Sequence, residues 1–214
     1  MLHHLIFVWF NWVKTGGYLG IIALMAMESS IFPVPSEVVI PPAAYWAQQG
    51  QLNLWGVIAA GTFGSWLGSA ITYWLALWLG RLVIVKWGRF FLISEDKLAR
   101  AERFVHRYEA GGIFFARLLP VIRHLISIPA GIVRMGFGIF SLMTIVGSLA
   151  WCSVLAWFGA KLAKENPGLI DDPAAMVTAI KHESLPIVVA VLVLGILYFL
   201  ALRLTAPRAA ATTA

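Results

Sequence analysis

The sequence is short of charge and of cysteine, and each shortage excludes a class of protein. Charged residues make up 12% of the 214 residues, about half of the roughly 25% found in soluble domains. The single cysteine, Cys152, excludes an internal disulfide and a thiolate metal cluster; it stands in an apolar run and is expected to be a small core residue. We expect no metal ion and no cofactor. In place of charge, the chain is 60% hydrophobic, which predicts an all-α integral membrane protein.

Basic residues are concentrated in one stretch of the chain. The formal net charge of +6 comes largely from residues 81–109 rather than from a diffuse basic surface, so nucleic acid is not an expected partner. Within the linker 81–110, apolar residues recur on one helical face after Ser94-Glu95-Asp96, which is typical of a helix start. This pattern predicts an amphipathic helix on the cytoplasmic side of the membrane.

Three apolar segments are long enough to cross a bilayer as helices, at 55–79, 137–160 and 185–203. Two further apolar stretches, 17–49 and 111–133, are interrupted by charges and prolines. Proline removes a backbone donor and disrupts the preceding turn, and each remaining half is too short to cross alone. Both stretches are therefore predicted to be re-entrant helical hairpins. The expected breaks in these hairpins are Pro33, Pro35, Pro120 and Pro129.

The distribution of lysine and arginine predicts the orientation in the plasma (inner) membrane. The linker 81–110 and the C-terminus are expected in the cytoplasm and the loop 161–183 outside, with residues 1–15 at the interface and a tail at 204–214. The two hairpins then enter from opposite faces of the membrane. Opposed broken helices, each followed by a spanning helix, are the pattern of an inverted repeat with a site at the midplane.

Three kinds of local pattern predict how the helices pack, where one of them begins and where they meet the membrane surface. Gly64 and Gly68 form a small-xxx-small pair, which permits the close approach of another helix. Ser36 followed by Glu37 is typical of a helix start, where a hydroxyl caps free N–H groups. Tryptophans near the ends of apolar runs suit an interfacial aromatic belt. These tryptophans are Trp46, Trp55, Trp78 and Trp87.

The predicted hairpins carry two acids, Glu28 and Glu37, and two arginines, Arg117 and Arg123. A cation at the centre of a bilayer costs about 2.5 to 3.5 kcal/mol, so these side chains need partners or a water-filled cavity. Arginine stays protonated and its forked donors match phosphate oxygens, which makes the two arginines candidate substrate-binding residues. A carboxylate in a low-dielectric site can take up a proton, which makes the two acids candidate proton-coupling residues. The alternative is that the four charges only neutralise each other and brace the hairpins, with His124 as a hydrogen-bonding spacer.

These charges lie within motifs that resemble the DedA family, part of the wider group with the VTT or SNARE-associated Golgi protein domain. The motifs are F-P-V-P-S-E at 32–37, F-A-R-L-L-P-V-I-R at 115–123 and P-A-G at 129–131. The resemblance covers roughly residues 16–160. It implies two opposed re-entrant hairpins, movement of undecaprenyl phosphate or phospholipids across membranes, and dependence on the proton-motive force. It also implies that the same four charged residues hold positions on which family members depend.

Two departures from the family pattern affect the span after the first hairpin. Family members often have an acid where this chain has Ser69, and a later Gly-Arg pair where Ala76-Leu77 follow Tyr73. The lipid substrate is therefore not carried over from the family.

The expected function is a flippase-like lipid translocase that is coupled to the proton gradient and supports envelope homeostasis. Its expected partners are a membrane lipid, either undecaprenyl phosphate or a phospholipid, and protons; a homo-oligomer is one option for its assembly. The alternative is a proton-coupled exporter of small solutes or cations, which would use the same acids without a lipid. A membrane lipid phosphatase is the third hypothesis, because His124 stands beside an arginine. Against this hypothesis, the sequence has no second histidine in its membrane segments and lacks the motifs of lipid phosphatases.

Overall fold

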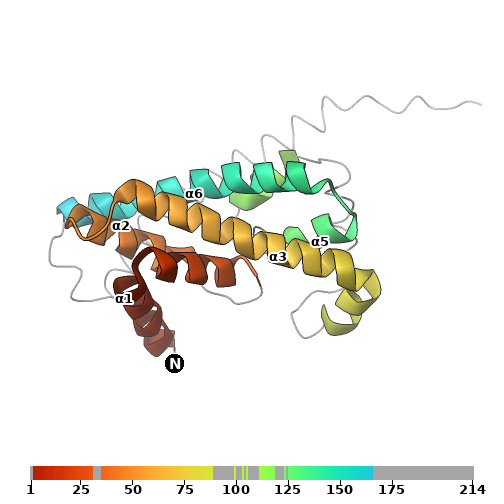
Figure 1. Cartoon of the computed structure of the whole chain (residues 1–214), viewed down its shortest axis with the longest axis horizontal. Coiled ribbons are helices and arrows are strands. Elements are labelled where there is room, and N and C mark those ends of the chain that lie inside the picture. Colours follow the sequence, from red (N-terminus) through yellow and green to blue (C-terminus); the bar gives the residue numbers. More distant parts are fainter. Residues whose placement is uncertain are drawn as a thin grey trace, which may run out of the picture.

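The computed structural model describes residues 2–30, 35–88, 99, 103, 105, 111–118, 123 and 125–165. These residues form helices, turns and short connections, with no β-strand among them, so the all-α prediction is confirmed for this part of the chain. Two long helices, α3 (Leu54–Gly88) and α6 (Phe137–Glu165), run side by side along the molecule (Figure 1). The helices α1, α2 and α5 pack against these two.

The two long helices are antiparallel and have the apolar surface of membrane spans. Gly61 of α3 lies beside Cys152 of α6, whereas Tyr73 further along α3 stacks on Phe140 with ring centroids 4.8 Å apart. By length and composition, Leu54–Leu79 and the whole of α6 could each cross a membrane. They match two of the three predicted spans. Cys152 is buried in the core between the helices, as predicted.

Both long helices run past the predicted ends of their spans. α3 continues to Gly88, and α6 continues beyond Ala160 to Glu165. In the added turn of α6, Leu162 is buried in the core, and Nζ of Lys161 lies 3.8 Å from Oε1 of Glu165. These contacts extend the helix into a stretch that is more polar than the span, which is why local hydropathy placed its end too early.

Two of the predicted belt tryptophans are exposed, as a membrane interface requires, and a third is not; the belt itself stays a prediction. Trp55 and Trp78 are both exposed on α3. They lie about 34 Å apart along the axis at the usual helical rise, close to the roughly 30 Å of a bilayer core. Trp46 is instead buried and packs on Phe10 with ring centroids 4.7 Å apart. It has an apolar core partner that the local pattern could not reveal. The side chain of Trp87 lies outside the described part of the structure.

The first helix, α1 (Leu2–Glu28), contains a sharp bend. Gly17 has a φ of 51°, a left-handed conformation that glycine adopts without a Cβ clash. The bend brings Gly20 against the backbone carbonyl of Trp12. The predicted interfacial segment 1–15 is therefore helical from residue 2 and continuous with α1, and its position relative to the membrane stays a prediction.

Two helix pairs accompany the long helices. The first helix pair consists of residues 17–28 of α1 followed by the 3-10 helix η1 (Ser36–Val38) and α2 (Ile40–Gln48). The second helix pair consists of the helical segment 111–118 followed by α5 (Ser127–Ile132). They occupy the stretches that the sequence predicted to be hairpins.

Prolines stand at the starts of the second helices in both pairs. Pro35 precedes η1, and Pro41 begins α2 beside a further proline. Pro129 lies in the first turn of α5, where the missing N–H has no helical acceptor. The predicted breaks at Pro35 and Pro129 thus lie at or beside helix starts, whereas Pro33 and Pro120 lie outside the described residues.

α1 packs on α3 at the glycine pair that the sequence predicted. Gly64 lies against the backbone of Ile22, and Gly68 lies against the backbone of Ala26. A Cβ at either glycine would overlap main-chain atoms of α1, which cannot move aside as a flexible side chain would. The predicted close approach is confirmed.

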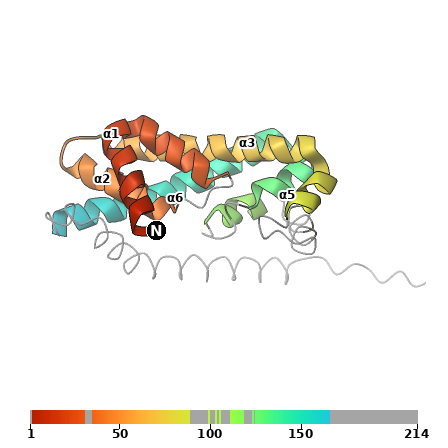
Figure 2. The same ribbon diagram turned by 90° about the horizontal axis from the view of Figure 1, so that it is seen from below.

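Each helix pair contacts both long helices. In the first pair, α1 packs on α3 and α2 packs on α6. In the second pair, α5 packs on α3, and the segment 111–118 approaches α6 where Gly147 leaves space for Arg117. Figure 2 shows α1 and α2 near one end of α3 and α5 near the other. The two pairs therefore meet between the long helices, away from their ends.

Several predicted segments lie outside the described residues. They include most of the linker 81–110, His124, the greater part of the loop 161–183, the span 185–203 and the tail 204–214. These stay predictions from the sequence.

Candidate functional site

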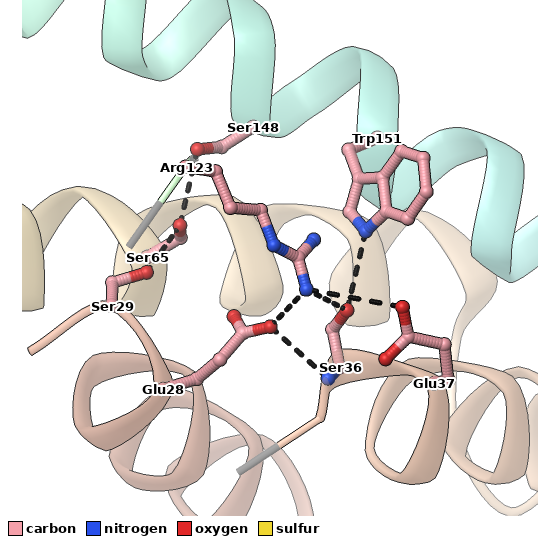
Figure 3. A network of polar contacts seen from close by, with 8 residues as sticks. All are labelled: Glu28, Ser29, Ser36, Glu37, Ser65, Arg123, Ser148 and Trp151. Carbon is pink, nitrogen blue, oxygen red and sulfur yellow. Dashed lines mark hydrogen bonds and ion pairs between the residues drawn. The ribbon is translucent and has the colours of Figure 1, made fainter. Parts of the chain in front are cut away.

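A buried ion pair joins the two helix pairs. Glu28 is the last residue of α1, and its Oε1 accepts a hydrogen bond from the backbone N–H of Ser36 at 3.0 Å. The same oxygen pairs with Nη2 of Arg123, and both side chains are buried. Two charges out of water stay stable only if their attraction and further hydrogen bonds offset desolvation. Figure 3 shows the guanidinium of Arg123 between the side chains of the first helix pair and α6.

The hydroxyl of Ser36 and the indole of Trp151 hold the Arg123 guanidinium in place. Ser36 Oγ accepts hydrogen bonds from Arg123 Nη2 at 2.7 Å and from Trp151 Nε1 at 3.2 Å. The Trp151 ring lies 5.1 Å from Arg123 Cζ, within cation–π range. The predicted helix start is confirmed, because η1 begins at Ser36 with Glu37 in its first turn. The predicted hydroxyl cap is wrong: Pro35 is the residue before η1, and no side chain caps it. The hydroxyl is engaged by the cation and the indole instead.

Glu37 lies at the edge of the same cluster. Its Oε1 is 4.0 Å from Nη2 of Arg123. Its side chain is 18% exposed, compared with 1% for that of Glu28. Both predicted acids thus face one arginine, but Glu37 is farther from the guanidinium and closer to the surface.

Arg117 is buried without a carboxylate. It is 2% exposed, its Nη2 donates to Ser127 Oγ at 3.0 Å, and its Cζ lies 5.9 Å from the centre of the Phe140 ring. The described residues provide no acid within ion-pair distance. Its Nε and that of Arg123 are both buried, and neither has a hydrogen-bond partner in the part of the chain that the structure describes. A buried donor without a partner costs free energy unless a ligand or water satisfies it.

Both arginines line one small pocket between the helix pairs and α6. Its walls include Arg117, Arg123, Ser65, Ser148, Trp151 and Cys152. The enclosed space is about that of one water molecule. A larger group such as a phosphate can therefore enter only if the walls move apart. The pocket brings together both predicted substrate-binding residues, and Glu28 pairs with one of them at its edge.

Sequence reasoning missed the uncharged walls of this pocket. Ser148, Trp151 and Cys152 occupy positions i, i+3 and i+4 of α6, so they share one helical face. Polar and aromatic side chains at that spacing in an apolar span were a usable signal. Ser65 belongs to a hydroxyl-bearing face of α3 with Thr62 and Ser69, and the packing of α3 on α6 places that face here. Among the described residues, no three His, Cys, Asp or Glu side chains cluster as metal ligands would.

The fold and the site together define a class: helical membrane proteins with ionised side chains buried between broken helices. Comparison with known sequences narrows the class. The chain belongs to the VTT-domain family, which includes the DedA proteins, because the VTT domain model matches residues 34–161. This range contains three of the four predicted site residues; Glu28 lies just before it.

Bacterial relatives align over most of the chain. The Bacillus subtilis membrane protein YkoX is 32% identical over 199 residues, which cover 93% of this chain and 85% of the relative. Undecaprenyl phosphate transporter A of Bacillus subtilis is 31% identical over 196 residues, covering 92% and 93% respectively. A Lactococcus lactis subsp. cremoris protein named alkaline phosphatase-like protein is 33% identical over 195 residues, covering 87% and 88%. No solved structure matches the chain significantly.

Proposed function

We propose that this protein moves a phosphate-bearing membrane lipid across the bilayer, with Arg117 and Arg123 binding the phosphate and Glu28 exchanging a proton. The observation that carries this proposal is the unequal pairing of the two arginines. Arg123 is neutralised by Glu28, whereas Arg117 lines the same pocket and has no carboxylate partner among the described residues. A site with this excess of donors favours an anion. A relative named undecaprenyl phosphate transporter A supports a polyprenyl phosphate as the first substrate to test.

Glu28 and the lipid phosphate compete for Arg123, and this competition couples proton uptake to phosphate binding. With Glu28 ionised, the ion pair occupies one guanidinium of the pocket. A phosphate that enters must replace the carboxylate, and protonation of Glu28 removes the competing charge. Proton uptake and phosphate binding are thereby linked, because each favours separation of the same ion pair. Glu37, at the more exposed edge, passes protons between Glu28 and water.

In this proposal the two helix pairs are opposed re-entrant hairpins of an inverted repeat. The reciprocal packing of the pairs supports it. In the first pair α1 packs on α3 but α2 packs on α6, and α5 of the second pair packs on α3. The protein then lies in the inner membrane with the linker 81–110 and the C-terminus in the cytoplasm, and residues 185–203 form a third span. Alternating access would come from separation of the pairs around the pocket.

The test is transbilayer movement of a fluorescent polyprenyl phosphate and of a fluorescent phospholipid in proteoliposomes, with and without a pH gradient. We expect wild type to move the polyprenyl phosphate faster than empty liposomes. Arg123→Ala and Glu28→Gln should abolish this movement, provided that both variants elute as folded protein. If neither lipid moves faster than in empty liposomes, the translocase proposal is wrong and proton-coupled solute export becomes the better hypothesis.

The names of the Lactococcus relatives make lipid phosphatase activity the second candidate. Its test uses the same proteoliposomes, with release of inorganic phosphate from the polyprenyl phosphate as the readout. Under the translocase proposal, the lipid crosses the bilayer intact and no phosphate is released. Steady phosphate release that His124→Ala abolishes would establish the enzyme instead.

A further inference from the structure

Three serine hydroxyls from three helical elements meet at the pocket. Ser29, directly after α1, lies 2.8 Å from Ser65 of α3, measured between the Oγ atoms. Ser148 of α6 donates to the same Ser65 Oγ at 3.1 Å. All three are buried, and Figure 3 shows Ser65 between the other two hydroxyls. We call these three residues the serine cluster.

The serine cluster has one more proton than it has internal hydrogen bonds. Three hydroxyls carry three protons, and the described contacts between them use two. Ser65 and Ser148 line the pocket together with Arg117 and Arg123. The Nε atoms of both arginines are also buried without a partner. When Ser29 donates to Ser65, the Ser65 hydroxyl is the unused one. Three donors without a partner among the described residues then border the pocket: two guanidinium N–H groups and this hydroxyl.

We propose that the serine cluster is part of the headgroup site and selects a terminal phosphate. This inference rests on the proposed function and extends it to residues outside the four charged ones. A phosphate monoester presents three terminal oxygens, and each can accept one of the three unused donors. A phosphodiester, as in a glycerophospholipid, presents two and carries a second substituent on the phosphorus. One donor then stays unsatisfied in a buried site, and the extra substituent must fit between α3 and α6.

A purely structural role makes a different prediction. Serines often join helices inside membranes through hydrogen bonds, and this cluster does connect α1, α3 and α6. The chain contains a matched example of that role. Trp66 of α3 donates from Nε1 to Ser141 Oγ of α6 at 3.1 Å, and Ser141 does not line the pocket. Ser141→Ala therefore removes a bond between the same two helices without touching the pocket.

Chemical modification of the native Cys152 can report whether a ligand occupies the pocket. It is the chain's single cysteine, it is buried, and it lines the pocket beside the serines. Alkylation by N-ethylmaleimide therefore reports opening of the pocket, and a phosphate held between the arginines should block it. The fraction alkylated is measured by intact-protein mass spectrometry in detergent, at increasing concentrations of farnesyl phosphate, a monoester, or of dihexanoyl phosphatidylglycerol, a diester. The concentration that halves alkylation is compared within each variant, which corrects for differences in basal opening.

For wild type, we expect half-protection by farnesyl phosphate at a concentration at least about tenfold below that of the diester, since one hydrogen bond to a charged group differs. Ser65→Ala/Ser148→Ala should raise the farnesyl phosphate concentration about tenfold and leave that of the diester nearly unchanged. The single variants keep one pocket hydroxyl and should lie between, which keeps the test decisive if the double variant fails to fold. Ser141→Ala should behave as wild type.

The outcomes separate the two proposals. If neither lipid protects Cys152 of wild type, the headgroup site itself is wrong, and this inference falls with it. If farnesyl phosphate protects wild type and the serine variants equally, the phosphate site stands and the serine cluster is a packing feature only. If both lipids lose protection to the same extent, the serines bind phosphate without selecting the monoester, and the selectivity proposal is overturned.

Discussion

The two helix pairs share the same arrangement of two helices around a break, but the first pair carries acidic side chains and the second stretch carries arginines. In the first pair, Glu28 at the end of one helix bonds to Ser36 at the start of the next. In the second pair, Arg117 near the end of segment 111–118 bonds to Ser127 at the start of α5. Each pair thus ties a charged side chain across its own break to a buried serine. Only the carboxylate then gains an opposite charge among the described residues, and that charge is Arg123 of the second stretch.

Because only Arg123 is paired with a described carboxylate, we expect the two arginines to contribute differently to stability and to substrate binding. Removing one member of a buried ion pair leaves the other as an unpaired charge, which costs more than the pair was worth. Removing Arg117, which has no carboxylate partner among the described residues, leaves no unpaired charge there and only deprives the neutral Ser127 hydroxyl of a donor. We therefore expect substitutions at Arg123 to affect folding and function together, and substitutions at Arg117 to affect function alone.

The largest effect on folding is expected from Arg123→Met. It leaves Glu28 buried without its partner, which should lower the free energy of unfolding by about 3 to 5 kcal/mol. Denaturant unfolding in detergent micelles measures this. The double variant Glu28→Gln/Arg123→Met removes both charges and should recover most of the loss. A double variant as unstable as the single one would mean that Arg123 stabilises the fold through packing on Trp151 and not through its charge.

Arg117→Met should affect transport strongly and stability little. Because no described carboxylate loses a partner, the free energy of unfolding should stay within about 1 kcal/mol of wild type or rise. Movement of the polyprenyl phosphate in proteoliposomes should fall at least about tenfold, since a charged hydrogen bond to phosphate is lost. The exposed Arg134, just after α5, provides the control, and Arg134→Gln should retain wild-type transport. Strong destabilisation by Arg117→Met would show that both arginines are held by charge pairing.

Trp151 should matter to Arg123 and not to Arg117, because its ring contacts only the former among the described contacts. Trp151→Phe keeps an aromatic face but loses the N–H that Ser36 accepts, which should cost about 1 kcal/mol. Trp151→Leu also loses the cation–π contact and ring volume, and should cost about 2 kcal/mol or more. The measurement is the same unfolding experiment, repeated in the Arg123→Met background. If the two Trp151 substitutions stay equally costly there, Trp151 acts as core packing only.

The charged residues of the site stand out in the sequence, whereas its uncharged walls give a weaker signal. An arginine or glutamate in an apolar stretch stands out because burial of its charge is expensive, so Glu28 and Arg123 were identified before any fold was known. Ser65 and Trp151 lie on polar faces of their own helices, but the sequence does not say what those faces contact. They belong to the site only because Gly64 and Gly68 let α1 approach α3 closely and α6 packs alongside.

The same limit explains the errors in the fold. Trp46 follows the local pattern of an interfacial residue, but Phe10, far away in sequence, covers it. Ser36 follows the pattern of a helix cap, but a guanidinium from residue 123 takes its hydroxyl. In both cases a long-range partner outweighs the local preference, and local sequence contains no information about that partner.

The smallest effect is expected at the acid on the edge of the site. Glu37 lies 4.0 Å from Arg123 and is partly exposed, so its ion pair is screened by water and worth at most about 1 kcal/mol. Glu37→Gln should therefore lower the free energy of unfolding by no more than this, whereas Glu28→Gln, which weakens the buried pair, should cost more. Raising the salt concentration should reduce the Glu37 effect and leave the Glu28 effect nearly unchanged, because buried pairs are screened little. Equal costs with equal salt dependence would mean that the two acids share Arg123, and that the carboxylate which competes with phosphate cannot be assigned to Glu28 alone.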